Sequence, residues 1–197
     1  MNSTEIGQSI RPSMAVVGGG TMGVGIAYVY AAAGWITWVA EPDDGRASTM
    51  MATLTETAQA GLQRGKLTNT QKQDLLARIQ RVSSVPQLPL GLDLVVESVP
   101  ERLPLKQLVL REIDARSAKL IASNTSSMSI DLLAQSVSDP LRFIGMHYFN
   151  PVWSLQLVEL IRGECTSEST VALARQYAES LGKKTILVRD VPGFATS

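Results

Sequence analysis

Two residues in neighbouring apolar runs are the best suited to chemistry in this chain. His147 is the only histidine, and Glu159 follows twelve residues later within "LVELI". Imidazole exchanges protons near neutral pH, and a carboxylate at its second nitrogen fixes the tautomer and stabilises the charged ring. A charge in an apolar strand also needs a partner, because an unpaired buried charge is costly. On the residues alone, His147 is either a working acid/base or an ordinary structural histidine.

The strands that carry these two residues are expected to form an antiparallel hairpin. Apolar runs at 142–149 and 155–161 are separated only by "NPVWS", whereas a parallel crossover needs about a dozen residues. Trp153 is the midpoint, six residues from each partner. Directly opposed residues point to the same face with Cβ atoms about 5 Å apart, so the imidazole should lie beside the carboxylate. A bulge in the loop would shift the register by one and separate them.

A second chemical signal is the glycine-rich run "VVGGGTMG". Gly18, Gly20 and Gly23 follow the G-x-G-x-x-G pattern between an expected strand and an expected helix. The first glycine allows the tight turn, the second lets a pyrophosphate approach the backbone, and the third lets helix and strand pack closely. The helix begins near Thr21 and Met22 and presents its first N–H groups to the phosphates. The alternative is a glycine-rich turn that holds no ligand.

An acidic residue at the end of the next expected strand indicates which dinucleotide is bound. Glu41 lies 18 residues beyond Gly23. A carboxylate there accepts hydrogen bonds from the ribose hydroxyls and repels a 2′-phosphate, which favours NAD over NADP. Arg46 lies nearby and would soften that preference.

Short β-branched runs alternate with longer helical patterns along the chain. Strands separated by helical crossovers form a mostly parallel sheet covered on both faces. The sequence therefore predicts an α/β, Rossmann-like, doubly wound fold with an antiparallel hairpin late in the chain. The expected strands are 14–18, 36–40, 93–99, 119–124, 142–149, 155–161 and 184–190, and the expected helices are 22–34, 46–64, 69–80, 103–118, 129–137 and 168–181.

Composition excludes several classes of function. Acidic and basic residues balance at 18 each, so no net field favours nucleic acid or an anionic membrane surface. One histidine and one cysteine, Cys165, leave no cluster for zinc or iron. We therefore expect no metal, no nucleic-acid partner and no membrane partner, and we expect Cys165 to be a partly buried thiol.

The N-terminus is polar and lacks the apolar core of a signal peptide. We expect residues 1–12 to be a flexible leader, residues 13–197 to be one NAD-binding domain, and the protein to be cytoplasmic. The uncharged stretch from Pro12 to Ala40 is long enough for a membrane span, which is the alternative there. Its six glycines instead divide it into strand, turn, helix, turn and strand.

Six motifs occur in a fixed order along the chain: "VVGGGTMGVGIA", "DLVVESVPE", "ASNTSS", "GMHYFNPV", "LVELIRG" and "VPGF". In this combination the sequence resembles the NAD-binding domain of the L-3-hydroxyacyl-CoA dehydrogenases, from about residue 14 to the last residue. The resemblance implies an oxidoreductase of fatty acid metabolism, in β-oxidation. It would oxidise a (3S)-3-hydroxyacyl-CoA to the 3-oxoacyl-CoA with NAD as hydride acceptor.

The resemblance also implies roles for catalytic residues. His147 would be the catalytic base and Glu159 its orienting partner. Ser126 of "SNTSS" and Asn150 of "FNP" would hydrogen-bond the substrate oxygens. On the residues alone, Asn150 could instead be a turn residue, and Ser126 could cap the helix expected at 129–137 or belong to its entry turn.

Further positions follow from the same resemblance. Glu101 and Lys106 match positions on the nicotinamide ribose side of NAD, although Lys106 could also be a plain solvated lysine. Thr57 and Arg64 fall near positions that touch the CoA moiety.

The sequence departs from the family pattern at its end. The family's helical C-terminal domain, which closes the acyl-CoA cleft and makes a homodimer, would begin at "VPGFATS", and Ser197 stands where the family usually has Asn. We therefore expect this chain to bind NAD(H) but to turn over acyl-CoA poorly by itself. Two other functions stay open: a dehydrogenase of a non-CoA hydroxy acid, such as carnitine or a sugar acid, and a catalytically idle, crystallin-like nucleotide-binding protein.

Overall fold

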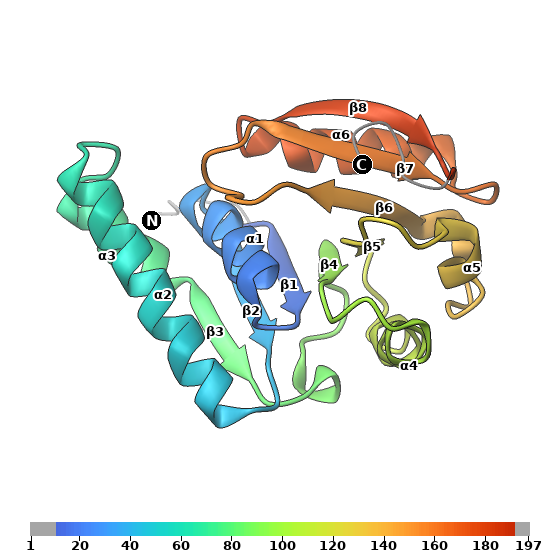
Figure 1. Ribbon diagram of the computed structural model, residues 1–197, viewed down its shortest axis with the longest axis horizontal. Coiled ribbons are helices and arrows are strands. Elements are labelled where there is room, and N and C mark those ends of the chain that lie inside the picture. Colours follow the sequence, from blue (N-terminus) through green and yellow to red (C-terminus); the bar gives the residue numbers. More distant parts are fainter. Residues whose placement is uncertain (1–10, 192–197) are drawn as a thin grey trace, which may run out of the picture.

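A single eight-stranded sheet with helices on both faces organises the chain (Figure 1). The computed structural model describes residues 11–191, so most of the predicted leader and Ser197 lie outside the described residues. The strands are β1 (Ser13–Val17), β2 (Ile36–Ala40), β3 (Ile79–Val82), β4 (Leu94–Glu97), β5 (Leu120–Ser123), β6 (Phe143–Tyr148), β7 (Leu157–Arg162) and β8 (Lys184–Arg189). The helices are α1 (Thr21–Ala32), α2 (Asp44–Gln63), α3 (Asn69–Ala77), α4 (Leu103–Asp114), α5 (Ile130–Ala134) and α6 (Glu168–Ser180), and 3₁₀ turns cover Val85–Gln87 and Pro140–Arg142.

The strand order explains where a ligand can bind. The order is β3-β2-β1-β4-β5-β6-β7-β8, and β1 to β6 all run parallel. The winding direction reverses between β1 and β4, and at such a reversal a crevice opens beyond the carboxyl ends of the strands. The predicted Rossmann-like, doubly wound fold is confirmed.

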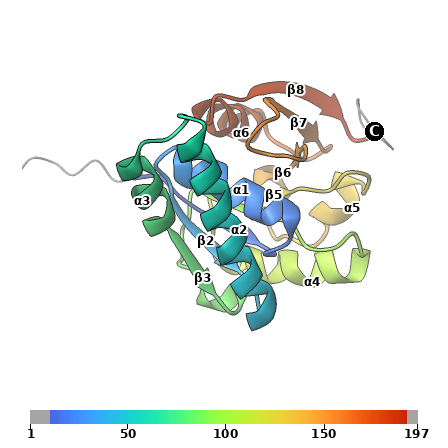
Figure 2. The same ribbon diagram turned by 60° about the vertical axis from the view of Figure 1, so that its left-hand side comes forward.

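Helices cover both faces of the sheet (Figure 2), and an apolar layer lies between the sheet and each group of helices. Helices α1, α2, α3 and α6 pack on one face, and α4 and α5 pack on the other. Alternate residues of β1 enter the two layers: Met14 and Val16 face the first group, and Ala15 and Val17 face the second. Because both faces are covered, the central strands are apolar throughout rather than alternating.

The late hairpin has the predicted register. β7 pairs antiparallel with β6, and β8 pairs parallel with β7. His147 lies directly opposite Glu159, so the loop introduces no shift that would separate the two side chains. Both project from the face of the sheet that α4 and α5 cover, because Ile161, two residues beyond Glu159, belongs to that layer.

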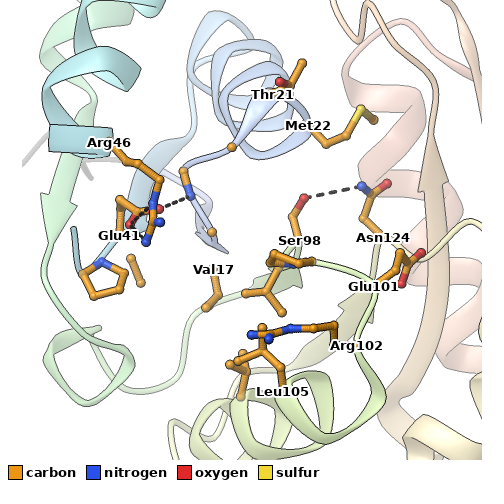
Figure 3. A pocket seen from close by; sticks show the side chains of 18 of the residues that line it. Val17, Thr21, Met22, Glu41, Arg46, Ser98, Glu101, Arg102, Leu105 and Asn124 are labelled. Atoms are coloured by element: carbon orange, nitrogen blue, oxygen red, sulfur yellow. Dashed lines mark hydrogen bonds and ion pairs between the residues drawn. The ribbon is translucent and has the colours of Figure 1, made fainter. Parts of the chain in front are cut away.

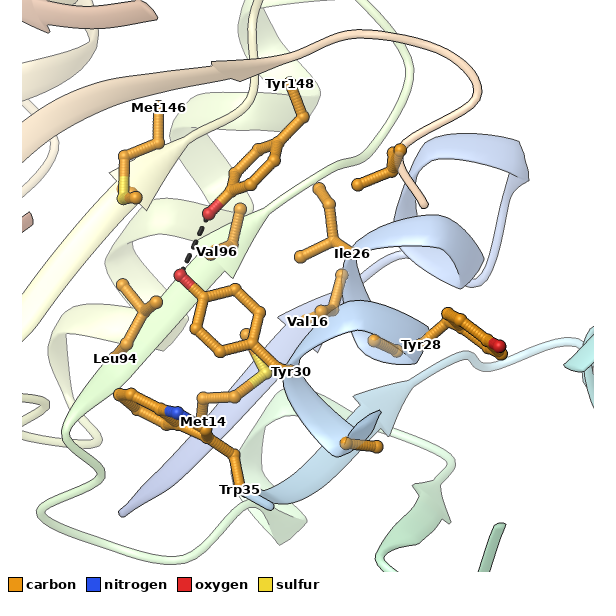
Figure 4. Close-up of a cluster of buried hydrophobic side chains, with 14 of the residues drawn as sticks. Met14, Val16, Ile26, Tyr28, Tyr30, Trp35, Leu94, Val96, Met146 and Tyr148 are labelled. Carbon is orange, nitrogen blue, oxygen red and sulfur yellow. Dashed lines mark hydrogen bonds between the residues drawn. The ribbon is translucent and has the colours of Figure 1, made fainter. Parts of the chain in front are cut away.

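On the opposite face, two tyrosines join α1 to β6 (Figure 4). The hydroxyl oxygens of Tyr30 and Tyr148 lie 2.9 Å apart, and both residues are buried. Burial raises the pKa of Tyr30 and of Tyr148, so both phenols stay neutral. This hydrogen bond connects the helix after the glycine turn to the strand that carries His147.

Four predictions about local structure are wrong. The helix predicted at 69–80 ends at Ala77, and β3 follows it. β3 is only four residues long and buries only Ile79 fully, so its alternation is too short to recognise without its partner β2. The helix predicted at 103–118 ends at Asp114, and the helix predicted at 129–137 covers only Ile130–Ala134. Cys165 is exposed rather than partly buried, because it lies in the turn between β7 and α6.

The uncharged stretch from Pro12 to Ala40 folds as β1, α1 and β2 inside the sheet and its first helical layer. None of the helices within 11–191 combines the length and the apolar character that a bilayer crossing needs.

Candidate active site

A cavity of about 890 Å³ lies beyond the carboxyl ends of the parallel strands. Its wall includes the glycine turn after β1, the segment after β4 and the end of β6. Figure 3 shows Glu41 and Arg46 at one side of the cavity and Asn124 and Glu101 at the other. The cavity therefore occupies the crevice expected at the β1/β4 reversal. The glycine turn and His147 both line it.

The glycine turn has the geometry that the motif predicts. Gly18 has φ of 110°, and a Cβ there would lie 2.6 Å from the carbonyl oxygen of Ser98. A Cβ on Gly23 would lie 1.9 Å from the carbonyl oxygen of Gly18, so α1 packs directly on the turn. Gly20 instead has open space around its Cβ position. It is also the N-cap of α1, with no side-chain cap, so the first N–H groups of the helix face this opening.

Glu41 is held beside the glycine turn by main-chain donors. Its Oε2 accepts from Gly19 N–H at 3.0 Å, and its Oε1 accepts from Asp43 N–H at 3.0 Å. Arg46 Nε also donates to Oε1 at 3.0 Å, forming an ion pair. Burial alone would raise the pKa of Glu41, but these hydrogen bonds together lower it. The carboxylate is therefore charged, and the guanidinium that we expected to soften NAD selectivity is bound to it.

Beneath the cavity lies a buried ion-pair network that the sequence did not reveal. Lys106 is 1% exposed, and its Nζ lies 2.8 Å from Glu97 Oε1 and 3.3 Å from Glu101 Oε2. Ser123 Oγ also donates to Glu97 Oε2, at 2.6 Å. Glu97 carries the same signal that identified Glu159, an acidic residue inside an apolar strand. Lys106 is thus no solvated lysine, and its route to the cavity runs through Glu101, so its predicted contact with the nicotinamide ribose stays a prediction.

Glu101 organises the loop that carries Ser126. Its Oε1 accepts from Ser126 N–H and from Thr125 Oγ1, each at 2.8 Å. Burial would raise the pKa of Glu101, but these bonds and the ammonium of Lys106 lower it. Both Glu101 and Ser126 line the cavity. The alternative that Ser126 caps the following helix is wrong, because Ser129 caps α5.

The imidazole and its carboxylate meet at the end of β6. His147 Nδ1 lies 2.8 Å from Glu159 Oε2. Glu159 is fully buried, whereas His147 lines the cavity and its ring lies 4.4 Å from the ring of Phe149. His147 therefore presents a carboxylate-supported imidazole to the same space as the glycine turn.

Two asparagines flank the imidazole along the cavity wall. Asn150 lines the cavity immediately after β6. Asn124, which sequence reasoning missed, accepts from Tyr148 N–H at 2.9 Å and donates to Ser98 Oγ at 3.4 Å. Asn124 is the third residue of the motif "ASNTSS", so that motif was the signal from which it could have been predicted. Asn124 thus joins the end of β6 to the segments after β4 and β5.

A second, smaller cavity of about 400 Å³ lies between α1, α2 and the β6–β7 loop. Thr57 and Arg64 both line it, together with Lys66, Tyr28 and Trp153. The two positions that the resemblance links to CoA therefore share one cavity, outside the larger one.

The fold, the glycine turn and the charged Glu41 define a Rossmann domain of the NAD-dependent dehydrogenase class. The sequence profile described as "3-hydroxyacyl-CoA dehydrogenase, NAD binding domain" matches residues 13–191. The chain belongs to this family, and NAD is its cofactor.

Similar proteins of known name agree with this assignment. The chain is 40% identical over 195 residues to the alpha subunit of the fatty acid oxidation complex of Pseudomonas syringae pv. tomato, covering 96% of this chain and 26% of that protein. The solved (S)-3-hydroxybutyryl-CoA dehydrogenase of Ralstonia eutropha matches with a TM-score of 0.89 and 40% identity, over 95% of this chain and 66% of that one. The 3-hydroxybutyryl-CoA dehydrogenase of Escherichia coli matches with a TM-score of 0.88 and 30% identity, over 93% of this chain and 39% of that one. The chain thus spans about a quarter of the length of the complex subunits that it matches.

Proposed function

We propose that this chain is the NAD-binding and proton-transferring part of an enzyme that oxidises (3S)-3-hydroxyacyl-CoA to 3-oxoacyl-CoA. The observation that carries the proposal is the 2.8 Å contact between His147 Nδ1 and Glu159, on a histidine that lines the same cavity as the glycine turn. Oxidising a secondary alcohol removes a hydride from carbon and a proton from oxygen, so a base must stand beside the cofactor site.

The pairing of His147 gives the direction of proton transfer. When Nδ1–H donates to Glu159, the lone pair of the neutral ring lies on Nε2. That nitrogen takes the proton of the C3 hydroxyl, and Glu159 stabilises the imidazolium that forms. NAD, when bound, supplies the carbon that accepts the hydride. In the reverse direction the imidazolium returns its proton to the 3-oxo group.

Ser126 and Asn150 complete the site by positioning the substrate. Both line the cavity with His147, and their hydroxyl and amide groups suit the oxygens of a 3-hydroxyacyl thioester. The rigid support of Ser126 comes from Glu101, which binds its main-chain N–H. Orientation of this kind matters because a small misplacement of the reacting atoms costs a large factor in rate.

The second cavity supports a CoA thioester over a smaller hydroxy acid. Arg64 and Lys66 offer positive charge for phosphate groups, while Tyr28 and Trp153 offer aromatic surface. The β6–β7 loop borders both cavities, since Asn150 lines the first and Trp153 lines the second. A substrate of carnitine or sugar-acid size would fill only the space near His147.

A substrate screen on the protein that contains this chain tests the proposal. We expect the wild type to reduce acetoacetyl-CoA and longer 3-oxoacyl-CoA esters with NADH. The double variant Arg64→Ala/Lys66→Ala should lose this activity, while its affinity for NADH stays that of the wild type. Turnover of carnitine or a sugar acid with none of acetoacetyl-CoA would contradict the CoA substrate. NADH binding without turnover of any hydroxy acid would favour the idle nucleotide-binding protein.

The cytoplasmic location and the homodimer stay predictions. Fractionation of the source cells tests the first, and light scattering on the protein that contains this chain tests the second.

A further inference from the structure

Lys183 is a buried lysine whose ammonium group is bound by main-chain oxygens of the β6–β7 loop. Its Nζ donates to the carbonyl oxygens of Val152 and Leu155, each at 2.7 Å, and the residue is 7% exposed. Burial lowers the pKa of this ammonium, and no charged group in the described part of the chain offsets the shift. The positive charge is therefore stabilised by carbonyl dipoles of one loop rather than by a carboxylate.

The main chain at Lys183 is fixed from the other side. Helix α6 ends at Ser180 and is followed by Gly182 at φ of 73°, whose N–H donates to Glu179 O at 2.9 Å. The Lys183 N–H reaches back to Ala178 O at 3.3 Å. These two bonds form a Schellman motif, which closes the helix and leaves its last carbonyls satisfied. The Lys183 side chain thus extends toward the loop from a rigid helix end, where the helix dipole favours a cation.

The loop that Lys183 contacts carries residues of both cavities. Asn150 lines the larger cavity, and Trp153 lines the second one and packs edge-on against Tyr28 at 6.0 Å between ring centroids. Between them, Val152 is buried against α1 so closely that a Cβ on Gly25 would lie 2.7 Å from it. A movement of this loop would therefore displace the walls of both cavities together.

We propose that Lys183 is a positioning residue, which holds the β6–β7 loop where Asn150 and Trp153 face the substrate. Moving the loop away would leave a buried ammonium without its two acceptors, and an unsatisfied buried charge is among the costliest groups in a protein. The expected effect of Lys183 on substrate binding rests on the proposed function, whereas its expected effect on the position of the β6–β7 loop does not.

Hydrogen exchange tests the loop without any substrate. The N–H groups of Ser154 and Leu155 both donate to Pro151 O at 3.0 Å, so their exchange reports opening of the loop. In Lys183→Met we expect these amides to exchange about 10-fold faster or more, since a lost hydrogen bond to a charged group is a large local change. Amides of β1 should exchange as in the wild type. Lys184→Met, at an exposed neighbouring lysine, is the matched control and should leave the loop unchanged.

Kinetics on the protein that contains this chain test the link to substrate. In Lys183→Met we expect kcat/KM for acetoacetyl-CoA to fall about 10-fold or more, mainly through KM, while the dissociation constant of NADH stays within about twofold. Lys183→Arg keeps donors for the carbonyls and should restore part of the loss. A purely structural role would lower substrate and NADH binding alike, together with the midpoint of unfolding.

Two results would overturn the inference. One is unchanged exchange of Ser154 and Leu155 in Lys183→Met. The other is faster exchange with unchanged kcat/KM for acetoacetyl-CoA. If Lys183→Met does not fold, Lys183→Gln takes its place with the same two readouts, because it keeps a shorter amide donor. If the wild type turns over no acyl-CoA, the proposed function fails, and the exchange result still decides whether Lys183 holds the loop.

Discussion

The two ends of the large cavity are built from different parts of the chain. At the cofactor end, the parts that would approach the phosphates are main-chain groups of the glycine turn and the first N–H groups of α1. At the catalytic end, the parts that would act on substrate are the side chains of His147, Ser126 and Asn150. The first end lies among parallel strands, whereas the second brings Ser126, after β5, to the antiparallel hairpin that carries His147.

Because of this difference, the two ends should tolerate different kinds of amino-acid substitution. A site built from main chain is sensitive to space, because a single added Cβ meets a backbone atom or a phosphate. A site built from side chains is sensitive to chemistry, because a side chain of the same shape that cannot accept and release a proton no longer supports catalysis. Substitutions at the two ends should therefore separate these two sensitivities.

The largest effect is expected at the catalytic end. Replacing His147 with Gln keeps a similar volume but removes the basic nitrogen. We expect kcat of the protein that contains this chain to fall by about 10²–10⁴, the usual contribution of general acid/base catalysis. The dissociation constant of NADH, measured by fluorescence titration, should stay nearly unchanged. Equal losses in kcat and NADH affinity would show that the two ends are not separable in this way.

At the cofactor end, two glycines should respond differently to the same added methyl group. Gly23→Ala places a Cβ 1.9 Å from Gly18 O, so we expect the free energy of unfolding to drop by about 1–3 kcal/mol. Gly20→Ala has room for its Cβ, so it should cost less than Gly23→Ala, about 0.5–1 kcal/mol, because alanine is a poorer N-cap than glycine. Its NADH affinity should nevertheless fall about 10-fold or more, because the methyl group takes the space of the phosphates.

Urea unfolding and NADH titration measure both variants. If Gly20→Ala binds NADH like the wild type, the phosphates do not approach this turn, and the main-chain account of the cofactor end fails.

Cofactor selectivity tests the charged side chains at that end, Glu41 and its partner Arg46. Glu41→Gln removes the charge that would repel a 2′-phosphate and releases Arg46 from its ion pair. We expect NADP affinity to rise about 10-fold or more, since like charges placed together cost several kcal/mol. The double variant Glu41→Gln/Arg46→Ala should lose most of this gain. Unchanged discrimination in both variants would mean that Glu41 does not face the ribose.

A smaller effect, on stability, is expected at the buried hydrogen bond between Tyr30 and Tyr148, which connects α1 to β6. Tyr148→Phe leaves the Tyr30 hydroxyl buried without its partner, which should cost about 1–2 kcal/mol of unfolding free energy. Tyr30→Phe/Tyr148→Phe removes both hydroxyls and should cost less than the sum of the single variants. Strict additivity in urea unfolding would indicate that the hydrogen bond contributes nothing.

The smallest effect is the pH dependence of stability. The pKa of Glu101 is lowered in the folded chain, since bonds from Ser126, Lys106 and Thr125 outweigh its burial. The folded state therefore binds fewer protons than the unfolded state below the ordinary glutamate pKa of 4.5. Its contribution is complete above that value and is lost as pH falls through the lowered pKa.

Glu101→Gln should therefore flatten the loss of stability between about pH 5 and pH 3. Urea unfolding across this range measures the slope. If the unfolding free energy of Glu101→Gln depends on pH as steeply as that of the wild type, Glu101 is not part of a charged network beside Ser126.

The sequence predicted the sheet and its hairpin because these depend on local signals. The glycine motif, the crossover lengths and the midpoint at Trp153 are readable from neighbouring residues, and the structure confirms the pairing of His147 with Glu159. β3 was missed because its partner β2 lies about 40 residues away in sequence and its own four residues carry little alternation. The ion pair of Lys106 with Glu97 was missed for a similar reason, since burial of a lysine is set by the packing of α4 and not by its neighbours in sequence.

Catalysis as proposed requires the imidazole and the nicotinamide to share one end of the cavity. A crystal structure of the protein with NAD bound measures this directly. We expect the phosphates at Gly20, the adenosine ribose on Glu41, and the nicotinamide ring beside His147, with Glu159 on Nδ1 of that histidine. A nicotinamide ring bound away from His147, or His147 and Glu159 on opposite faces of the sheet, would contradict the account.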